Sequence, residues 1–232
     1  MSILSVKNLN VSLGGQRILE DISFELQKGE SLAIIGPNGA GKTVLFRALL
    51  GFIPYTGKIN WQPNIKIGYV PQKIDFDRYL PISLEDFLLA KARILGLSKK
   101  EIEKKLEAVG FSKILLKSNL GHLSFGQFQR ALIAFALLGD PDVLLLDEAT
   151  LGVDAPFETY IYEIIYRLQS KEKMTILLIS HEFEVVYKYT DKVLCLNKKM
   201  LCFGLPEEAL SEKSLATLYK DAAHYHHHHG TS

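Results

Sequence analysis

A glycine-rich turn between a strand and a helix constrains this chain more than any other feature. Residues 31–35 (SLAII) form a mostly apolar run, and the segment GPNGAGKT at residues 36–43 follows it directly. Residues 44–50 then show a helix-like pattern. A buried strand that leads through such a turn into a helix is the setting of a phosphate-binding loop, or P-loop. The sequence therefore predicts an α/β fold that binds a nucleoside triphosphate.

Each residue type in this turn suits a polyphosphate ligand. Glycines let the backbone curve closely around an anion, so that N–H groups and the helix N-terminus point at it. Lys42 can reach the β- and γ-phosphates, and the Thr43 hydroxyl can ligate Mg²⁺. A chance glycine-rich turn is the alternative, but it does not explain why strand, glycines, lysine and hydroxyl coincide. The predicted nucleotide-binding residues of the loop are Gly36, Pro37, Asn38, Gly39, Ala40, Gly41, Lys42 and Thr43.

Composition restricts the class of protein. The chain has 232 residues, 47% of them hydrophobic, which is enough for one large domain with a sizeable core. A formal charge of +1 gives no bias toward nucleic acid or anionic lipid. The longest apolar run, residues 131–138, is far shorter than the roughly 20 residues of a membrane span. We see no signal peptide and expect a protein that is soluble alone, although it could still sit against a membrane protein.

The cysteines and histidines leave little room for a metal centre. Only Cys195 and Cys202 occur, which fits a reducing compartment, and we interpret both as small apolar strand residues. Residues 222–232 resemble a purification tag with one histidine replaced; a natural metal-binding tail is the alternative. With that tail set aside, the remaining histidines are His122 and His181.

Periodicity along the chain predicts the layout of the fold. Alternating residues at 3–11 and 16–26, separated by Gly14-Gly15, indicate an N-terminal antiparallel β part. Apolar strands that alternate with helices indicate a mostly parallel sheet, with its ligand beyond the carboxyl ends of the strands. A helical subdomain is expected over about residues 80–125, within a single domain over 1–221. Further strands are expected at 66–70, 143–146, 175–180, 192–196 and 200–203, and further helices at 126–138, 156–169, 183–189, 206–210 and 214–219.

Two acids follow the strand at residues 143–146. Asp147 and Glu148 come at its carboxyl end, where a buried carboxylate requires a cation. Asp147 is therefore predicted to hold Mg²⁺, commonly through water, and Glu148 to act as the general base on an attacking water. The alternative is an ordinary Asp-Glu pair in a turn.

Three more positions extend this predicted site. Gln72 follows a strand end and can contact the metal or the water, while His181 follows another strand and can hydrogen-bond the γ-phosphate. Ser124 precedes a helix, so it is expected to be an N-cap beside a second anion site. Taken singly, Gln72 would be a solvated residue and His181 a structural one.

Taken together, these motifs resemble the ATP-binding-cassette (ABC) ATPases over about residues 2–220. The matching set is GPNGAGKT, Gln72, LSFGQ, LLLDE, Asp154 and His181, in this order and spacing. The resemblance implies a P-loop NTPase core of RecA-like type that binds ATP and Mg²⁺ and hydrolyses ATP. It also implies a dimer that clamps ATP between one P-loop and the partner's LSFGQ segment. The nucleotide-binding set then gains Ser124, Gly126, Gln127 and Asp154.

A narrower resemblance concerns the cassettes of zinc and manganese importers. It rests on residues 68–73 (GYVPQK), 75–78 (DFDR), 193–197 and 201–204. It implies a subunit on the cytoplasmic face of the cell membrane that docks a transmembrane permease through Gln72 and the helical subdomain. An external binding protein would deliver the metal, which would not touch this subunit.

Three positions depart from the family pattern. Leu13 stands where an aromatic residue usually stacks on adenine, so we include it in the nucleotide site with a weaker base contact. Phe125 replaces the first glycine of LSGGQ, and Ala149 replaces a common proline after Glu148. No catalytic group is removed. The alternatives are a cassette for a substrate other than metal, a nucleotide sensor that barely hydrolyses, and an ABC ATPase acting on DNA or ribosomes. The balanced charge argues against nucleic acid as a partner.

Overall fold

The computed structural model of the protein describes residues 2–74, 79–149 and 155–219. It contains two compact units, Met1–Pro63 with Leu177–Ser232, and Asn64–Ile176. The predicted tail at 222–232, Asp154 and residues 75–78 lie outside the described residues. The single domain expected over residues 1–221 stays a prediction.

The first unit opens with the expected antiparallel sheet. Strands β1 (Ser2–Leu13) and β2 (Gln16–Gln27) form a hairpin, and β4 (Thr56–Trp61) pairs with the other edge of β1. The hairpin turn needs positive φ at two successive residues, which Gly14 (φ 56°) and Gly15 (φ 80°) supply. Strand β4 was not predicted, because residues 51–63 carry several turn residues. Among them, Gly57 is required where β4 meets β1, since a Cβ there would overlap the Asn8 carbonyl.

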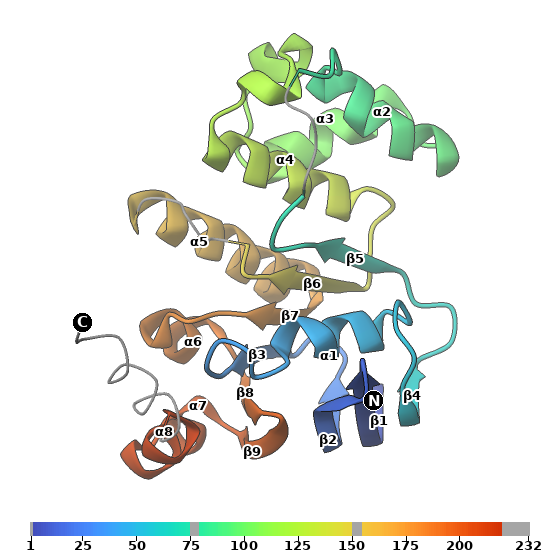
Figure 1. Ribbon diagram of the computed structural model, residues 1–232. Coiled ribbons are helices and arrows are strands. Elements are labelled where there is room, and N and C mark those ends of the chain that lie inside the picture. The colour runs from blue at the N-terminus through green and yellow to red at the C-terminus, as the bar shows by residue number, and fades with distance from the viewer. Residues whose placement is uncertain (1, 75–78, 150–154, 220–232) are drawn as a thin grey trace, which may run out of the picture. The chain divides into compact units, whose positions relative to one another are not determined.

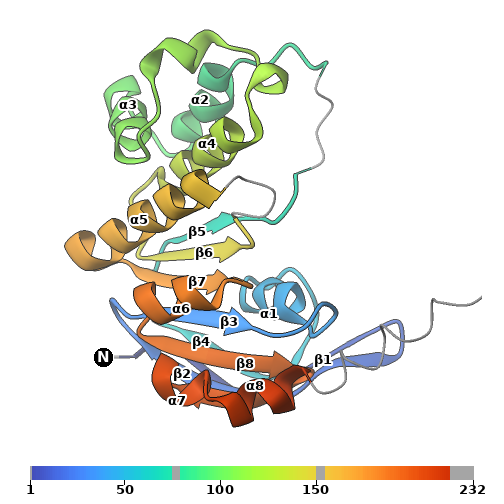
Figure 2. The ribbon, with the colours of Figure 1, turned by 90° about the vertical axis from the view of Figure 1, so that its left-hand side faces the viewer.

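Buried parallel strands form the core of the first unit. Strand β3 (Ser31–Ile35) is buried throughout and runs parallel to β8 (Lys192–Asn197), which pairs antiparallel with β9 (Lys199–Gly204). Helix α1 (Lys42–Leu49) follows β3 and lies beside it in both views (Figure 1, Figure 2). The remaining helices of this unit are α6 (Phe183–Tyr189), α7 (Pro206–Ala209) and α8 (Glu212–Tyr219).

The second unit contains a parallel strand pair and a helical region. Strand β5 (Ile67–Val70) pairs with the buried strand β6 (Val143–Asp147) in parallel. The expected helical subdomain consists of α2 (Leu84–Ile94), α3 (Lys99–Ala108) and two short 3₁₀ helices, Lys113–Lys117 and Leu120–His122. Helix α4 (Phe125–Leu137) packs against α2 and α3. Helix α5 (Ala155–Glu172) is followed by β7 (Thr175–Ile179). The boundary between the two units along the chain falls within β7.

Three helices of this unit begin with the same capping device. Ser83, Ser98 and Ser124 are N-caps of α2, α3 and α4, and each takes part in a capping box with the residue three positions later. The predicted N-cap at Ser124 is confirmed. Each box satisfies backbone N–H groups that the first turn of a helix leaves without partners.

One sequence-based interpretation was wrong. Cys195 and Cys202 are joined by a disulfide between β8 and β9, instead of being two separate apolar strand residues. The pairing became possible because the hairpin register places them directly opposite each other, and their spacing alone did not indicate this.

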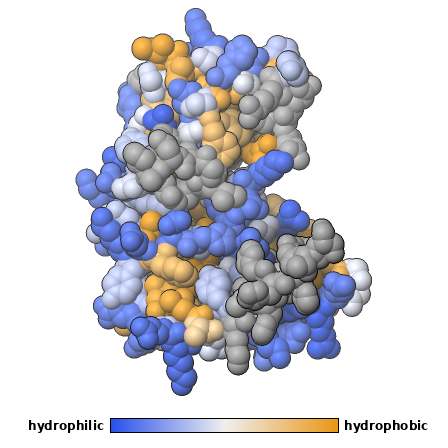
Figure 3. Space-filling model, turned by 60° about the vertical axis from the view of Figure 1, so that its left-hand side comes forward, coloured by the Kyte–Doolittle hydropathy of each residue, from blue (hydrophilic) through white to orange (hydrophobic). Residues whose placement is uncertain are grey.

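Among the described residues, no helix combines the length and the apolar character that a bilayer crossing requires. Figure 3 shows one face on which hydrophilic side chains are interspersed with smaller hydrophobic areas.

Candidate functional site

The P-loop connects β3 to α1 through three glycines with unusual backbone angles. Gly36, Gly39 and Gly41 have φ values of 156°, 79° and 97°, and Gly41 is the left-handed N-cap of α1. The left-handed φ favours glycine at this position, and a Cβ at Gly41 would lie 2.7 Å from the end of the Leu19 side chain, which would have to shift. A Cβ at Gly39 would meet no atom within 4 Å, so this side of the turn faces open space. The tight, open turn before a helix N-terminus fits an anionic ligand.

Lys42 lies inside the curve of this loop. Its side chain is buried, and its Nζ donates hydrogen bonds to the carbonyl oxygens of Gly36 (2.9 Å) and Pro37 (3.2 Å). A buried ammonium group requires such partners, because desolvation disfavours its charge. The loop backbone therefore fixes a positive charge beside the N-terminus of α1, and both features attract phosphate. Thr43, the predicted Mg²⁺ ligand, is the next residue of the same helix.

Two further predicted residues belong to the first unit. Ser180 follows β7 and donates its backbone N–H to the Ile34 carbonyl (3.4 Å), which places the exposed His181 just beyond the strand end that neighbours β3. Leu13 lies at the tip of the β1–β2 hairpin, where 37% of its surface is exposed. The position of His181 at a strand end agrees with the sequence-based expectation.

The predicted catalytic acid belongs to the second unit and has a close partner there. Gln72 Nε2 donates a hydrogen bond of 2.5 Å to Glu148 Oε2. The register of the parallel pair explains this contact, because Val70 of β5 lies opposite Leu146 of β6 and each side chain follows two residues later. Glu148 has a φ of 48°, a left-handed conformation that a non-glycine residue adopts only when its surroundings impose it.

Asp147 is the other acid of this strand end. Its side chain is fully buried, and the Tyr69 hydroxyl lies 3.4 Å from Asp147 Oδ2 and can donate to it. The backbone after the acids is held by Gln129 of α4, whose Nε2 donates to the Ala149 carbonyl at 2.6 Å. Sequence reasoning did not select Tyr69 or Gln129. Tyr69 lies opposite Leu145 in the register of β5 and β6, and this register between separate segments has no local sequence signal.

The LSFGQ segment forms the N-terminus of α4. The Gln127 backbone N–H donates to Ser124 Oγ (3.2 Å), and the Ser124 N–H donates to Gln127 Oε1 (2.9 Å). Ser124 is exposed and Gly126 occupies the first turn of the helix. Phe125 is exposed as well, with 45% of its surface accessible. These contacts form a capped helix N-terminus that begins at an exposed residue, and the positive end of a helix dipole favours an anion.

The structure thus groups the predicted residues within each unit. The first unit contains Leu13, the P-loop from Gly36 to Thr43, and His181. The second contains the bonded pair Gln72 and Glu148, together with Asp147, Ser124, Gly126 and Gln127. Asp154 falls outside the described residues.

Comparison with known proteins gives a consistent result. Residues 19–151 match the family described as ABC transporter. The chain is 37% identical to the zinc import ATP-binding protein ZnuC of Pseudomonas syringae pv. syringae, over 98% of this chain and 87% of that protein. It is 38% identical to the protein of the same name from Buchnera aphidicola subsp. Schizaphis graminum, over 99% of this chain and 97% of that one.

Solved structures show the same fold. The chain resembles cbiO1 from Clostridium perfringens, part of the ABC transporter complex cbiONQ, with a TM-score of 0.79 and 26% identity over 97% of this chain and 98% of that one. It also resembles the ADP conformation of MJ1267, an ATP-binding cassette of an ABC transporter, with a TM-score of 0.81 and 23% identity over 95% and 99%. The expected class, a P-loop NTPase core with antiparallel and helical parts, is confirmed.

Proposed function

Because this chain belongs to the ABC transporter family, we propose that it is the ATP-hydrolysing subunit of an importer that takes up zinc. The assignment of zinc as the substrate rests on the similarity to zinc import ATP-binding proteins. These proteins are 36–39% identical to this chain over essentially its whole length. Uptake of manganese and uptake of a non-metal substrate by the same kind of subunit remain the alternatives.

The chemistry follows from the residues described above. Lys42, the loop amides and the N-terminus of α1 bind the β- and γ-phosphates of ATP and compensate their charge. Thr43, Asp147 and Gln72 are the proposed holders of Mg²⁺, which supplies charge neutralisation at the phosphates when it is bound. Leu13 packs against the base.

Glu148 is the proposed general base. Its carboxylate accepts a proton from the water that attacks the γ-phosphorus, and the bond between that phosphorus and the bridging oxygen breaks to release ADP and phosphate. The short hydrogen bond from Gln72 Nε2 fixes the orientation of this carboxylate. His181 is the proposed donor to a γ-phosphate oxygen, which keeps the phosphoryl group aligned with the water.

A second copy of the chain completes the site in this proposal. The exposed Ser124, with Gly126 and Gln127 at the N-terminus of α4, contacts the γ-phosphate of the ATP that the partner copy binds, and Asp154 links the two sites. Gln72 and the helical subdomain dock a transmembrane permease, so the subunit works at the cytoplasmic face of the membrane. An external metal-binding protein supplies the cargo, and nucleic acid is not a partner. The cargo does not contact this chain.

Transport by the assembled complex tests this proposal. The subunit and its permease are reconstituted in vesicles that hold ATP inside, on the side of this subunit. The binding protein and radioactive zinc are added outside. We expect ATP-dependent zinc accumulation that Glu148→Gln abolishes. Manganese and a non-metal solute are measured in parallel. Accumulation of either one in preference to zinc would replace the proposed substrate, whereas the absence of ATP hydrolysis would overturn the whole assignment.

A further inference from the structure

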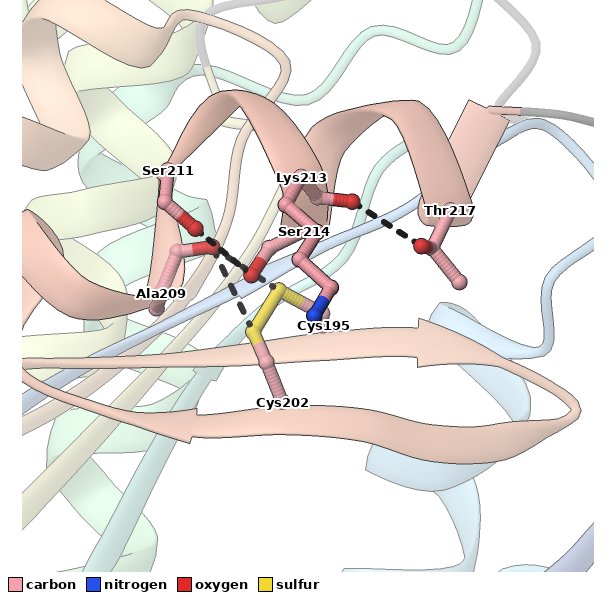
Figure 4. The surroundings of a disulfide bond; sticks show 7 residues. All are labelled: Cys195, Cys202, Ala209, Ser211, Lys213, Ser214 and Thr217. Carbon is pink, nitrogen blue, oxygen red and sulfur yellow. Dashed lines mark hydrogen bonds between the residues drawn. A yellow bond between two sulfur atoms is a disulfide. The ribbon is translucent and has the colours of Figure 1, made fainter.

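The disulfide occupies the hairpin that lies against the P-loop. Cys195 of β8 and Cys202 of β9 are direct register partners, with their Cα atoms 4.8 Å apart, within the range that a disulfide requires (Figure 4). They are the only cysteines of the sequence, so neither has a competing partner within the chain. None of the roles described so far uses this pair.

The surroundings of the two sulfur atoms suit both redox states. The carbonyl oxygen of Ala209, at the end of α7, lies 3.7 Å from each Sγ (Figure 4). In the disulfide neither sulfur carries a hydrogen atom. After reduction, a thiol at either position can donate its S–H to this carbonyl, so burial of the reduced pair leaves no polar group unsatisfied. Cys195 is fully buried, whereas Cys202 is partly exposed and gives a reagent access to one sulfur.

The residues enclosed by the disulfide support the P-loop directly. Leu196 follows Cys195, and a Cβ at Gly36 would overlap its carbonyl, so the two backbones are in close contact. At the tip of the hairpin, the Lys198 N–H donates to the Ala40 carbonyl at 3.0 Å. The Lys198 carbonyl in turn accepts from the Glu20 N–H at 2.8 Å. The loop closed by the disulfide therefore contacts the P-loop at its first residue and again at Ala40.

We propose that Cys195 and Cys202 form a redox site that adjusts nucleotide binding by the P-loop. The closed disulfide restrains the hairpin tip, so Leu196 and Lys198 hold Gly36 and Ala40 in the conformation that receives phosphate. Reduction releases this restraint, and the loop must then be ordered when the nucleotide binds, which lowers affinity. The inference rests on the proposed function in one respect, namely that ATP is the ligand of the P-loop.

The switching reaction is thiol–disulfide exchange with a dithiol. A thiolate of the dithiol attacks the accessible Cys202 Sγ, the Cys195–Cys202 bond breaks, and the Cys195 thiolate takes up a proton. The second thiol of the reagent then resolves the mixed disulfide, which releases the Cys202 thiol and leaves the reagent as its own disulfide. Two electrons pass from the dithiol to the protein, and a disulfide oxidant drives the same steps in reverse. In a reducing compartment, such disulfides are typically transient or redox-sensing.

Nucleotide affinity of the two redox forms tests the proposal. The purified full chain is prepared oxidised with a disulfide oxidant and reduced with dithiothreitol, and mass spectrometry confirms the change of two hydrogen atoms. Mg-ADP and Mg-ATP are then titrated into each form by calorimetry. We expect dissociation constants about fivefold higher for the reduced form, a change within the usual range of coupling between sites. The melting temperature without nucleotide is recorded to separate a general loss of stability.

The double variant Cys195→Ala with Cys202→Ala is the matched control. It should bind nucleotide like the reduced protein and show no response to dithiothreitol. If this variant does not fold, Cys202→Ala alone removes the bond while keeping the buried Cys195, and the same result is expected. Both variants leave the residues assigned to catalysis and phosphate binding unchanged.

Two results would overturn the inference. One is equal nucleotide affinity in the oxidised and reduced forms; the other is a chain whose thiols stay free after treatment with the oxidant. Failure of both redox forms to bind ATP is a different outcome, because it would refute the nucleotide site itself and with it the proposed function.

Discussion

Lys42 is a charged residue whose position is decided by backbone atoms. Its ammonium group is held by the carbonyl oxygens of Gly36 and Pro37 inside the loop. Because the ammonium group is already positioned in the loop, it needs little rearrangement to contact a phosphate. This preorganisation lowers the free-energy cost of nucleotide binding.

Replacement of Lys42 by alanine should mainly affect nucleotide binding. We expect the dissociation constant of Mg-ATP to rise by about tenfold or more, because hydrogen bonds to charged groups contribute roughly 1.5–3 kcal/mol each. Fluorescence titration measures this change. Lys7→Ala, at an exposed position of β1 in the same unit, is the control and should bind like the parent. Unchanged binding and turnover of the Lys42 variant would refute the P-loop assignment.

Glu148 is held at a strand end by a strained backbone and a hydrogen bond from Gln72. In the Glu148→Gln variant the general base is lost while the side chain keeps its size. We expect kcat to fall by about 10²–10⁴-fold, the usual contribution of such a group. ATP binding should persist, so gel filtration with Mg-ATP should show a stable dimer. Glu163→Gln, exposed on α5, is the control; full hydrolysis by the Glu148 variant would exclude Glu148 as the base.

At the scale of elements, the second unit uses one capping device for two purposes. Ser83 and Ser124 both accept a hydrogen bond from the backbone N–H three residues later, at the starts of α2 and α4. The first cap only completes a helix. The second is also proposed to bind the partner's ATP. A comparison of the two caps can therefore separate the effect on helix stability from the effect on ATP hydrolysis.

Alanine at each cap separates these purposes. Ser83→Ala and Ser124→Ala should each lower the free energy of unfolding by about 1 kcal/mol, the usual worth of an N-cap. Urea denaturation measures this loss. Only Ser124→Ala should also lower the steady-state rate of ATP hydrolysis. An equal loss of hydrolysis in both variants would mean that the Ser124 effect comes from helix stability alone.

At the scale of the whole molecule, the proposed site requires two copies of the chain. Each ATP would lie between the P-loop of one copy and the Ser124 segment of the other. If each site is shared in this way, a dimer of two chains with different substitutions can have both substitutions in one site and none in the other. A site formed within one chain cannot be restored in this way.

A mixture of two impaired variants tests this arrangement. Lys42→Ala and Ser124→Ala chains, each slower in hydrolysis alone, should gain activity when mixed, because a mixed dimer of a symmetric pair contains one site with neither substitution. With equal amounts, random pairing and independent sites, about a quarter of all sites should be intact, and they should add about a quarter of the parent rate. Phosphate release over a range of mixing ratios measures this gain. A mixture that never exceeds the rates of its two components would contradict a site shared between copies.

Much of the local structure was predictable because its causes are local. The glycines of the P-loop, the N-cap at Ser124, and the apolar strand ending in Asp147 each depend on residues within a few positions. Strand β4 was missed because its pairing with β1 depends on residues about fifty positions earlier, and its own turn residues obscured the pattern.

The amino-acid sequence by itself determined that a strand, a glycine turn and a helix would present Lys42, and that two acids would end a buried strand. Only the tertiary structure decided which side chains meet. The parallel register of β5 and β6 brings Gln72 to Glu148, and the hairpin register of β8 and β9 brings Cys195 to Cys202. Register depends on how separate segments pack and exchange hydrogen bonds, so contacts of this kind lie beyond any local pattern of residues.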